Sequence, residues 1–231
     1  MGKAKYKGFE DINSLQAPEK YMKQFEHITD PYRRTYAAMV ASLDDNVGRL
    51  MKWLKENKKL DNTIIWFMSD NGGYAVTHQR HASNGKLKGQ KAQLWEGGIR
   101  VPAMLMWKKN IKGGQLSHTP VCNVDVLPTL AAITGCSERL PKTIDGVDLV
   151  QLLLNQQPLQ RSLYWKFNNQ TAFREGDWKL VNGKELYNLK VDAEENQNVA
   201  EQHPEIVKQL REAQLKKEVE IKNGLDAKTG I

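Results

Sequence analysis

An apolar run, TIIWFMS at positions 63–69, stops abruptly at Asp70-Asn71-Gly72-Gly73. A run that is apolar on both faces is typical of a strand in the middle of a sheet with helices on both sides. Residues 101–107, VPAMLMW, form a second run of this kind. The two runs predict buried strands and therefore an α/β chain whose sheet is covered by helices.

Helices are predicted before the first run and after the second. One begins near Asp30, a suitable N-cap that is followed by Pro31. The other covers residues 123–134, with Asp125 near its start and Gly135 at its end. Apolar residues of the first helix recur at steps of three and four, which predicts one buried face formed by Tyr36, Met39, Val40, Leu43, Val47, Leu50, Met51 and Leu54.

The pattern changes after about residue 156, where short, partly alternating segments are separated by turn residues. They predict a small antiparallel sheet at residues 162–167, 171–174, 178–181 and 185–189. A final helix from about 204 to 222 has Ile206, Val207, Leu210 and Val219 available to cover that sheet. We place a boundary near Gln157-Pro158, which gives an α/β part at 1–157 and an α+β part at 158–231.

Composition limits the classes of partner. The net charge of +7 is spread along the chain and suits anionic partners, but no basic stretch is interleaved with aromatic residues, so a nucleic-acid partner is not expected. No apolar run is long enough to span a membrane, and the first residues lack the apolar stretch of an export signal. Cys122 and Cys136 form no CxxC pair, which leaves a disulfide and two free thiols both open.

The end of the first run is the first candidate site. Ligands of open α/β sheets bind beyond the carboxyl ends of strands. The carboxylate of Asp70 and the amide of Asn71 offer two hard oxygens to Ca²⁺ or Mg²⁺, and the two glycines let the backbone turn away. A plain turn explains the same residues, because Asn-Gly is a common turn dipeptide.

A second segment makes the assignment specific. Residues 89–102, GQKAQLWEGGIRVP, resemble the sulfatase signature G-x-K-x-x-x-x-E-G-G-x-R-x-P, which directly precedes a strand. The stretches LQAPEKY, DPYRRTYAAMVASLDDNVGRL, VDVLPTLAAITG, REGDWKLV and ELYNLKVDAEENQNVAEQHPEIV are also similar to segments of this family. The resemblance therefore extends over most of the chain.

The resemblance implies part of an alkaline-phosphatase-like fold and a sulfuric ester hydrolase. By it, Asp70 and Asn71 are two ligands of an active-site Ca²⁺, or Mg²⁺, and Lys91 is the catalytic lysine that contacts a sulfate oxygen or the departing bridging oxygen. A lysine at that place stabilises negative charge as it grows. The substrate is expected to be a sulfated small molecule or glycan, and the family acts in the periplasm, outside the cell or in lysosomes.

Other polar and aromatic residues near these motifs have two explanations. His78 and His81 lie in the loop before Lys91, where they would contact the sugar or a second anionic group of the substrate at the rim of the pocket, or belong to a solvated loop. For Glu96 and Arg100 we favour a structural role, pairing with each other or with backbone to fix the glycine turn. Solvated or structural roles are favoured for Asp44 and Asp45, and core positions for Trp165 and Trp178.

One part of the family pattern is absent. The nucleophile motif C/S-x-P-S-R, whose first residue becomes formylglycine, does not occur, and neither does the pair of aspartates that completes the metal site. Two oxygens are too few for Ca²⁺, which takes six to eight. We therefore expect the chain alone to be inactive and its exposed sheet edge to pair with a second copy or with the missing N-terminal half. A phosphatase of the same superfamily and a non-catalytic sulfatase-like assembly module remain the alternatives.

Overall fold

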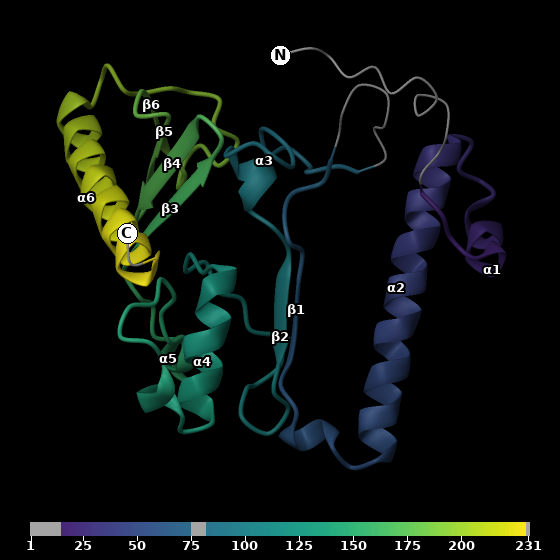
Figure 1. Ribbon diagram of the computed structural model, residues 1–231. Coiled ribbons are helices and arrows are strands. Elements are labelled where there is room, and N and C mark those ends of the chain that lie inside the picture. Colours follow the sequence, from purple (N-terminus) through teal and green to yellow (C-terminus); the bar gives the residue numbers. More distant parts are fainter. Residues whose placement is uncertain (1–14, 75–81, 230–231) are drawn as a thin grey trace.

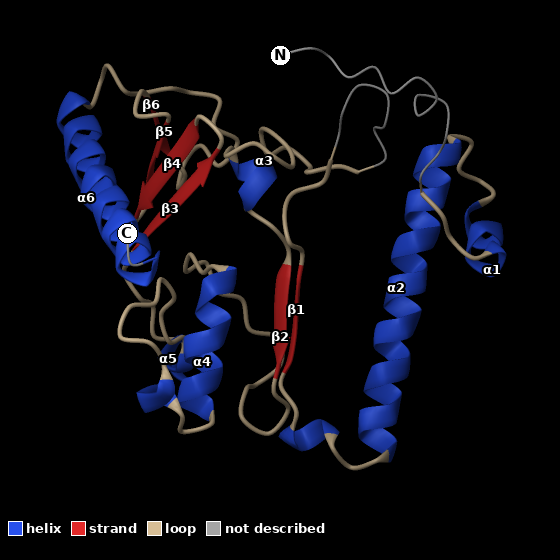
Figure 2. Cartoon of the chain, in the orientation of Figure 1, coloured by secondary structure: helices blue, strands red, loops and turns tan. Residues whose placement is uncertain are grey.

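The computed structural model describes residues 15–74 and 82–229, and side chains as far as residue 224. Helices and strands alternate in the first part, and a small sheet with one long helix follows (Figures 1 and 2). The elements of the first part are α1 (Glu19–Met22), η1 (Lys23–Phe25), α2 (Pro31–Glu56), η2 (Leu60–Asn62), β1 (Ile65–Met68), α3 (Glu96–Ile99), β2 (Ala103–Met106), η3 (Asn123–Asp125), α4 (Val126–Ile133), η4 (Ser137–Arg139) and α5 (Val150–Asn155).

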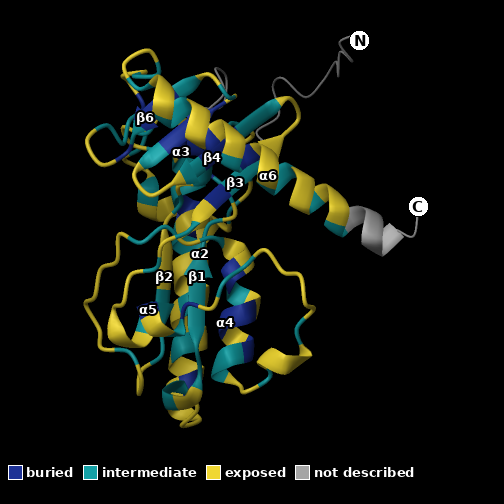
Figure 3. Ribbon diagram, turned by 90° about the vertical axis from the view of Figure 1, so that its left-hand side faces the viewer, coloured by how far each residue is buried: buried dark blue, intermediate teal, exposed yellow. Residues whose placement is uncertain are grey.

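The predicted first helix is confirmed as α2, but its predicted buried face is wrong. The Asp30 carboxylate accepts the N–H of Arg33 at 2.7 Å and caps the helix, with Pro31 in its first turn. Of the eight apolar residues expected to be buried, only Leu54 is. Met39, Val40, Leu43 and Leu50 are between 37% and 52% exposed, because α2 packs mainly against the short elements α1, η1 and η2. Figure 3 marks exposed residues in yellow.

The two apolar runs form the strands β1 and β2, as predicted. They pair antiparallel, with Ile65 opposite Met106 and Met68 opposite Ala103. Their burial is less than predicted, since no residue of β1 is fully buried and Met104 is 63% exposed. Within the described ranges this sheet has two strands. It is therefore not the central, fully covered sheet that the apolar runs predict.

The predicted helix at 123–134 is confirmed as η3 followed by α4, with Gly135 at its end in a left-handed conformation (φ +68°). Asp125 is fully buried at its start. Its carboxylate accepts the backbone N–H groups of Cys122 and Val147 and pairs with Arg161 at 2.5 Å. One buried carboxylate therefore ties α4 to the segments that enter and leave α5.

The C-terminal part has the predicted antiparallel sheet, with strands in sequence order and α6 across one face. Its elements are β3 (Ser162–Phe167), β4 (Gln170–Glu175), β5 (Trp178–Val181), β6 (Glu185–Asn188) and α6 (Pro204–Thr229). The core joins Phe173, Leu180 and Leu186 to Leu210 of α6. Val219 was expected in this core but is 56% exposed, because α6 runs beyond the edge of the four short strands.

The other face of this sheet packs against the first part of the chain. Val181, Tyr187 and Leu189 form a second buried cluster, and Trp95, just before α3, packs on it. The proposed division at 157–158 falls between α5 and β3, and as a domain boundary it stays a prediction. No described helix has both the length and the apolar character to cross a bilayer.

Candidate active site

The turn that follows β1 is fixed by hydrogen bonds. The Ser69 hydroxyl donates to the carbonyl of Asn71 at 2.9 Å, and the Asn71 N–H donates to the Asp70 carboxylate at 3.0 Å. The amide nitrogen of Asn71 donates to the Gly72 carbonyl at 3.0 Å. The second carboxylate oxygen of Asp70 and the amide oxygen of Asn71 accept no hydrogen bond from a described residue, so both are available to a ligand.

The signature segment lies directly beside this turn. The N–H of Ser69 donates to the carbonyl of Pro102 at 3.1 Å, and the N–H of Gly72 donates to the carbonyl of Gly98 at 2.9 Å. The approach is so close that a Cβ on Gly72 would lie 1.7 Å from the oxygen of Gly97. Only glycine fits at this position. Gly72 is therefore required by the close approach of the signature segment, and not merely by the turn.

The loop that carries Lys91 is bonded to the same turn. The N–H of Lys91 donates to the carbonyl of Gly73 at 3.3 Å. The side chain of Asn84 accepts the N–H of Gly73 at 2.7 Å and donates to the carbonyls of Gly73 and Gly89 at 3.1 Å. Asn84 is a residue that the sequence reasoning missed, since an isolated loop asparagine carries no motif.

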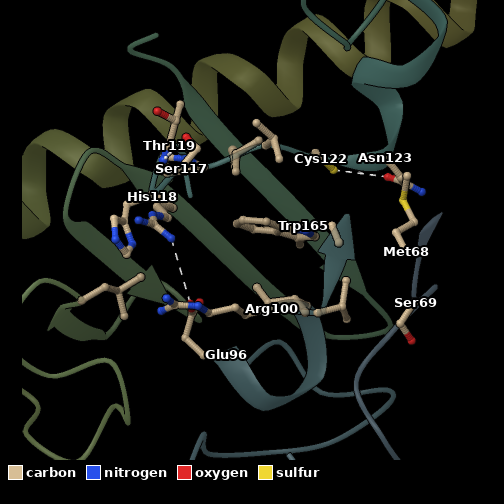
Figure 4. Close-up of a pocket in the computed structure, with 18 of the residues that line it drawn as sticks. Met68, Ser69, Glu96, Arg100, Ser117, His118, Thr119, Cys122, Asn123 and Trp165 are labelled. Atoms are coloured by element: carbon tan, nitrogen blue, oxygen red, sulfur yellow. Dashed lines mark hydrogen bonds and ion pairs between the residues drawn. The ribbon is translucent and has the colours of Figure 1, made fainter. Parts of the chain in front are cut away.

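Asp70, Asn71 and Lys91 line one cavity of about 1700 Å³. The cavity extends from the turn after β1 along α3 and β2 to the loop before α4 and to strand β3, and Figure 4 shows part of its wall. The side chain of Lys91 is exposed in it. The structure thus brings the three residues to a common cavity, as the sequence predicts, while their roles in binding stay predictions.

The oxygens of Asp70 and Asn71 are of the type that a hard divalent cation prefers, but they are too few to form a complete site. A carboxylate and an amide oxygen are ligands that Ca²⁺ prefers, and it takes six to eight of them. Within residues 15–74 and 82–224, no group of three or more acidic, histidine or cysteine side chains could hold a metal ion. Asp70 and Asn71 can therefore supply only part of a Ca²⁺ site.

The expected pairing of Glu96 with Arg100 is present at 3.7 Å, but Glu96 is the centre of a larger buried cluster. Its other oxygen accepts from Lys179 of β5 at 2.9 Å, and Lys179 also pairs with Glu195 at 2.8 Å. Glu195 in turn accepts the backbone N–H of Glu96 at 2.6 Å. Burial raises the pKa of Glu195, and Lys179 opposes that shift.

The remaining predicted residues divide into three groups. His78 and His81 lie outside the described residues. Asp45 has the structural role that was favoured, since it accepts the hydroxyl of Tyr21 at 2.5 Å and so ties α1 to α2. Cys122 and Cys136 are both free thiols.

The two strand tryptophans have different surroundings. Trp178 packs against the core under α6, as predicted. Trp165 instead lines the cavity, as does His118 of the loop before α4, and Figure 4 shows both side chains. With Trp66 and Phe167, Trp165 is one of the aromatic residues of the cavity lining that offer a flat apolar surface to a bound molecule.

Comparison with known proteins identifies the family. The family model described as Sulfatase matches residues 11–136, and the model described as N-sulphoglucosamine sulphohydrolase, C-terminal, matches residues 89–221. The N-acetylgalactosamine-6-sulfatase of Sus scrofa is 32% identical over 82% of this chain and 37% of its own length. The steryl-sulfatase of Homo sapiens is 39% identical over 51% of this chain and 21% of its own.

Solved structures extend the agreement to the fold. The crystal structure of Ps i-CgsB in complex with k-i-k-neocarrahexaose has a TM-score of 0.78 and 31% identity, and the match covers 87% of this chain and 46% of that one. A structure in complex with its substrate D-glucosamine-2-N,6-O-disulfate has a TM-score of 0.64 and 25% identity over 82% of this chain and 41% of that one.

The chain thus spans less than half the length of these relatives. The first family match alone covers more than half of its residues, and it includes the turn at Asp70-Asn71 and the loop at Lys91. This chain belongs to the sulfatase family, of the alkaline-phosphatase-like superfamily.

Proposed function

We propose that this chain contributes to the hydrolysis of sulfate esters, with Asp70 and Asn71 as metal ligands and Lys91 as the residue that binds the sulfate group. One observation carries the proposal. Two independent backbone hydrogen bonds, from Gly72 to Gly98 and from Lys91 to Gly73, hold the signature segment and the Asp70-Asn71 turn side by side at one cavity.

The chemistry of these side chains suits a sulfate ester. Lys91 is exposed and lines the same cavity as Asp70 and Asn71, so its ammonium group could contact an anion bound there. As the ester bond breaks, negative charge grows on the departing oxygen, and a positioned lysine stabilises that charge. A Ca²⁺ ion bound at Asp70 and Asn71 would supply Lewis-acid polarisation of the sulfate group.

The nucleophile that the family resemblance implies does not fit this chain. None of the 231 residues starts a C/S-x-P-S-R motif, so no residue here is a candidate for formylglycine, and we derive no step through it. We propose that the chain alone does not hydrolyse sulfate esters. Hydrolysis of an aryl sulfate by the purified chain, if stopped both by a chelator and by Lys91→Ala, would refute this.

A sulfated glycan is the substrate class that we favour. One solved relative is described in complex with k-i-k-neocarrahexaose and another with D-glucosamine-2-N,6-O-disulfate, and the family models that match describe sulfatases. These matches favour sulfate over the phosphate of the wider superfamily. A compartment outside the cytosol, namely periplasm, extracellular space or lysosome, accords with the family and remains part of the proposal.

A second polypeptide segment is part of the proposal too. The sheet of β1 and β2 and the face of α2 leave apolar residues exposed, among them Met104 at 63% and Leu43 at 50%. We propose that sulfatase-type sequence, absent from these 231 residues, pairs with this edge and completes the metal site. In its absence, a second copy of the chain would cover part of the same surface. A purely non-catalytic assembly role would use these faces without the Lys91 site.

Sulfate binding tests the function directly. We expect Lys91→Ala to weaken binding of inorganic sulfate, in the presence of Ca²⁺, by about tenfold or more, since a hydrogen bond to a charged group contributes about 1.5–3 kcal/mol. Isothermal titration calorimetry at fixed ionic strength would measure it. Lys112→Ala is the matched control, because Lys112 is exposed and lies outside the cavity wall. Equal sulfate affinity in both variants and in the unchanged chain would remove the support for Lys91.

A further inference from the structure

Two arginines at the cavity share a single carboxylate oxygen. The guanidinium of Arg100 lies 3.7 Å from one oxygen of Glu96, and that of Arg174, on β4, lies 4.0 Å from the same oxygen. Both separations exceed a hydrogen bond. The other Glu96 oxygen is already held by Lys179 at 2.9 Å. The two guanidiniums therefore retain N–H donors that Glu96 does not satisfy.

Three cations and three carboxylates lie around α3. Arg100, Arg174 and Lys179 face Glu96 and Glu195, and Asp177, which lines the same cavity, acts on Arg174. Burial lowers the pKa of Arg174, and the neighbouring Arg100 lowers it too, while the carboxylates of Glu96 and Asp177 oppose the shift. The two guanidiniums repel each other at a site where water is partly excluded, and a bound anion would relieve that repulsion.

Both side chains face the cavity that holds the proposed sulfate site. Arg100 belongs to the segment between Gly98 and Pro102, and these residues are hydrogen-bonded to Gly72 and Ser69 on either side of the Asp70-Asn71 turn. Arg100 and Arg174 both line the cavity, and the Arg100 side chain is 51% exposed. Figure 4 shows Arg100, His118 and Trp165 along the same wall.

We propose that Arg100 and Arg174 form a second anion subsite that binds a further sulfate ester of the same glycan, next to the sulfate held at Lys91. A guanidinium presents planar, forked N–H donors that match the oxygens of a sulfate group. His118 and Trp165 line the same cavity, where they would supply a polar edge and an aromatic face to the sugar ring. The inference rests on the proposed function and extends it from a sulfated to a multiply sulfated substrate.

Paired ligands separate this subsite from the Lys91 site. The 231-residue chain, with Ca²⁺ present, is titrated with a disaccharide that carries one sulfate ester on each sugar, and with its counterpart that carries one sulfate ester in all. We expect the disulfated ligand to bind about tenfold tighter at fixed ionic strength, as two charge-assisted contacts would give. Arg100→Gln should abolish that advantage, so that the two ligands bind with similar affinity.

Controls address folding and general charge. Arg139→Gln removes the same charge from a side chain that is 81% exposed on η4, outside the cavity wall, and should retain the advantage. Arg100→Lys retains the positive charge but lacks the forked N–H donors of a guanidinium, and it should keep part of the affinity advantage of the disulfated ligand. Circular dichroism of each variant verifies that the chain is folded.

The outcomes distinguish the two proposals. Equal affinity of the unchanged chain for both ligands, together with weaker binding of both by Lys91→Ala, would overturn the second subsite and leave the Lys91 site standing. An advantage that Arg100→Gln does not reduce would also overturn it. An affinity for the monosulfated ligand that Lys91→Ala leaves intact would contradict the proposed function instead, and binding of neither ligand would overturn both.

Discussion

The carboxylate of Glu96 joins the signature segment to the C-terminal sheet. Lys179 and Glu195 are both fully buried. The backbone N–H of Glu96 donates a hydrogen bond to the Glu195 carboxylate. Breaking a buried ion pair by removing one partner is strongly destabilising, because an uncompensated charge remains inside the protein. The position of the Lys91 loop therefore depends on residues about 90 positions further along the chain.

Lys179→Met tests this dependence. The change leaves Glu96 and Glu195 buried beside each other without their shared cation, and we expect a loss of about 3–5 kcal/mol in the free energy of unfolding. Urea denaturation followed by circular dichroism would measure it. Lys184→Met is the control, since Lys184 is exposed in the turn of the same sheet. A loss of similar size in both variants, or in neither, would contradict the role of the buried cluster.

At the residue scale, sequence reasoning predicts the motif residues and misses their supports. Asp70, Asn71 and Lys91 stand in a recognisable pattern, and the structure places them at one cavity. Lys179 sits inside an apolar strand, WKLV, where a lysine is normally taken to point to solvent. Its burial is set by a carboxylate that is distant in sequence, and no local pattern reveals such a partner.

At the element scale, local chemistry predicts the elements well and their burial less well. The four C-terminal strands are confirmed because their alternation and turn residues are local signals, as are Asp30 and Pro31 at the start of α2. The apolar face of α2 also follows from periodicity, but burial needs a covering element. The described chain provides none along Met39, Val40 and Leu43.

The tyrosines of the C-terminal sheet predict a loss of stability at high pH. Tyr164 donates to Glu218 of α6 at 3.0 Å, and burial together with this carboxylate raises the Tyr164 pKa to about 12. Burial and Glu185 also raise the pKa of Tyr187. Because the folded state holds these protons more tightly, both contributions are complete below pH 10.0, the ordinary pKa of tyrosine, and decline above it. The contribution of Tyr164 is lost as pH rises through about 12.

Denaturant unfolding between pH 9 and about 12 measures this effect. Tyr164→Phe should flatten the decline in the free energy of unfolding, since the phenol that titrates differently in the two states is removed. Tyr74→Phe is the control, because Tyr74 is exposed and outside the sheet. A decline equally steep in Tyr164→Phe and the unchanged chain would show that this tyrosine does not contribute.

At the scale of the whole molecule, the exposed apolar surface is the main feature. It comprises one face of α2, the outer part of α4 with Leu127 at 58%, and Met104 of β2. Large exposed apolar surfaces on proteins mark interaction sites. They accord with a chain that spans less than half of its relatives and with the proposed pairing along β1 and β2.

We expect the isolated chain to self-associate through this surface. The double change Leu43→Lys with Leu50→Lys should shift the chain towards monomer, because both side chains are about half exposed on α2. Sedimentation velocity over a range of concentrations would measure the shift. Val191→Lys, at a loop residue that is 81% exposed and away from α2, is the control. A monomer at all concentrations without the changes would contradict the expectation.

The convergence of the Asp70-Asn71 turn and the Lys91 ammonium on one ion and anion site is tested most directly with Mn²⁺, a paramagnetic cation that accepts the same oxygen ligands as Ca²⁺. The lysine side chains are labelled at Cε, and Lys91→Arg assigns the Lys91 signal. We predict that Mn²⁺ broadens the Lys91 signal more strongly than that of Lys112, and that Asp70→Ala abolishes the difference. A Lys91 signal that stays sharp while the Asn71 amide is broadened would place the lysine away from the ion and contradict a shared site.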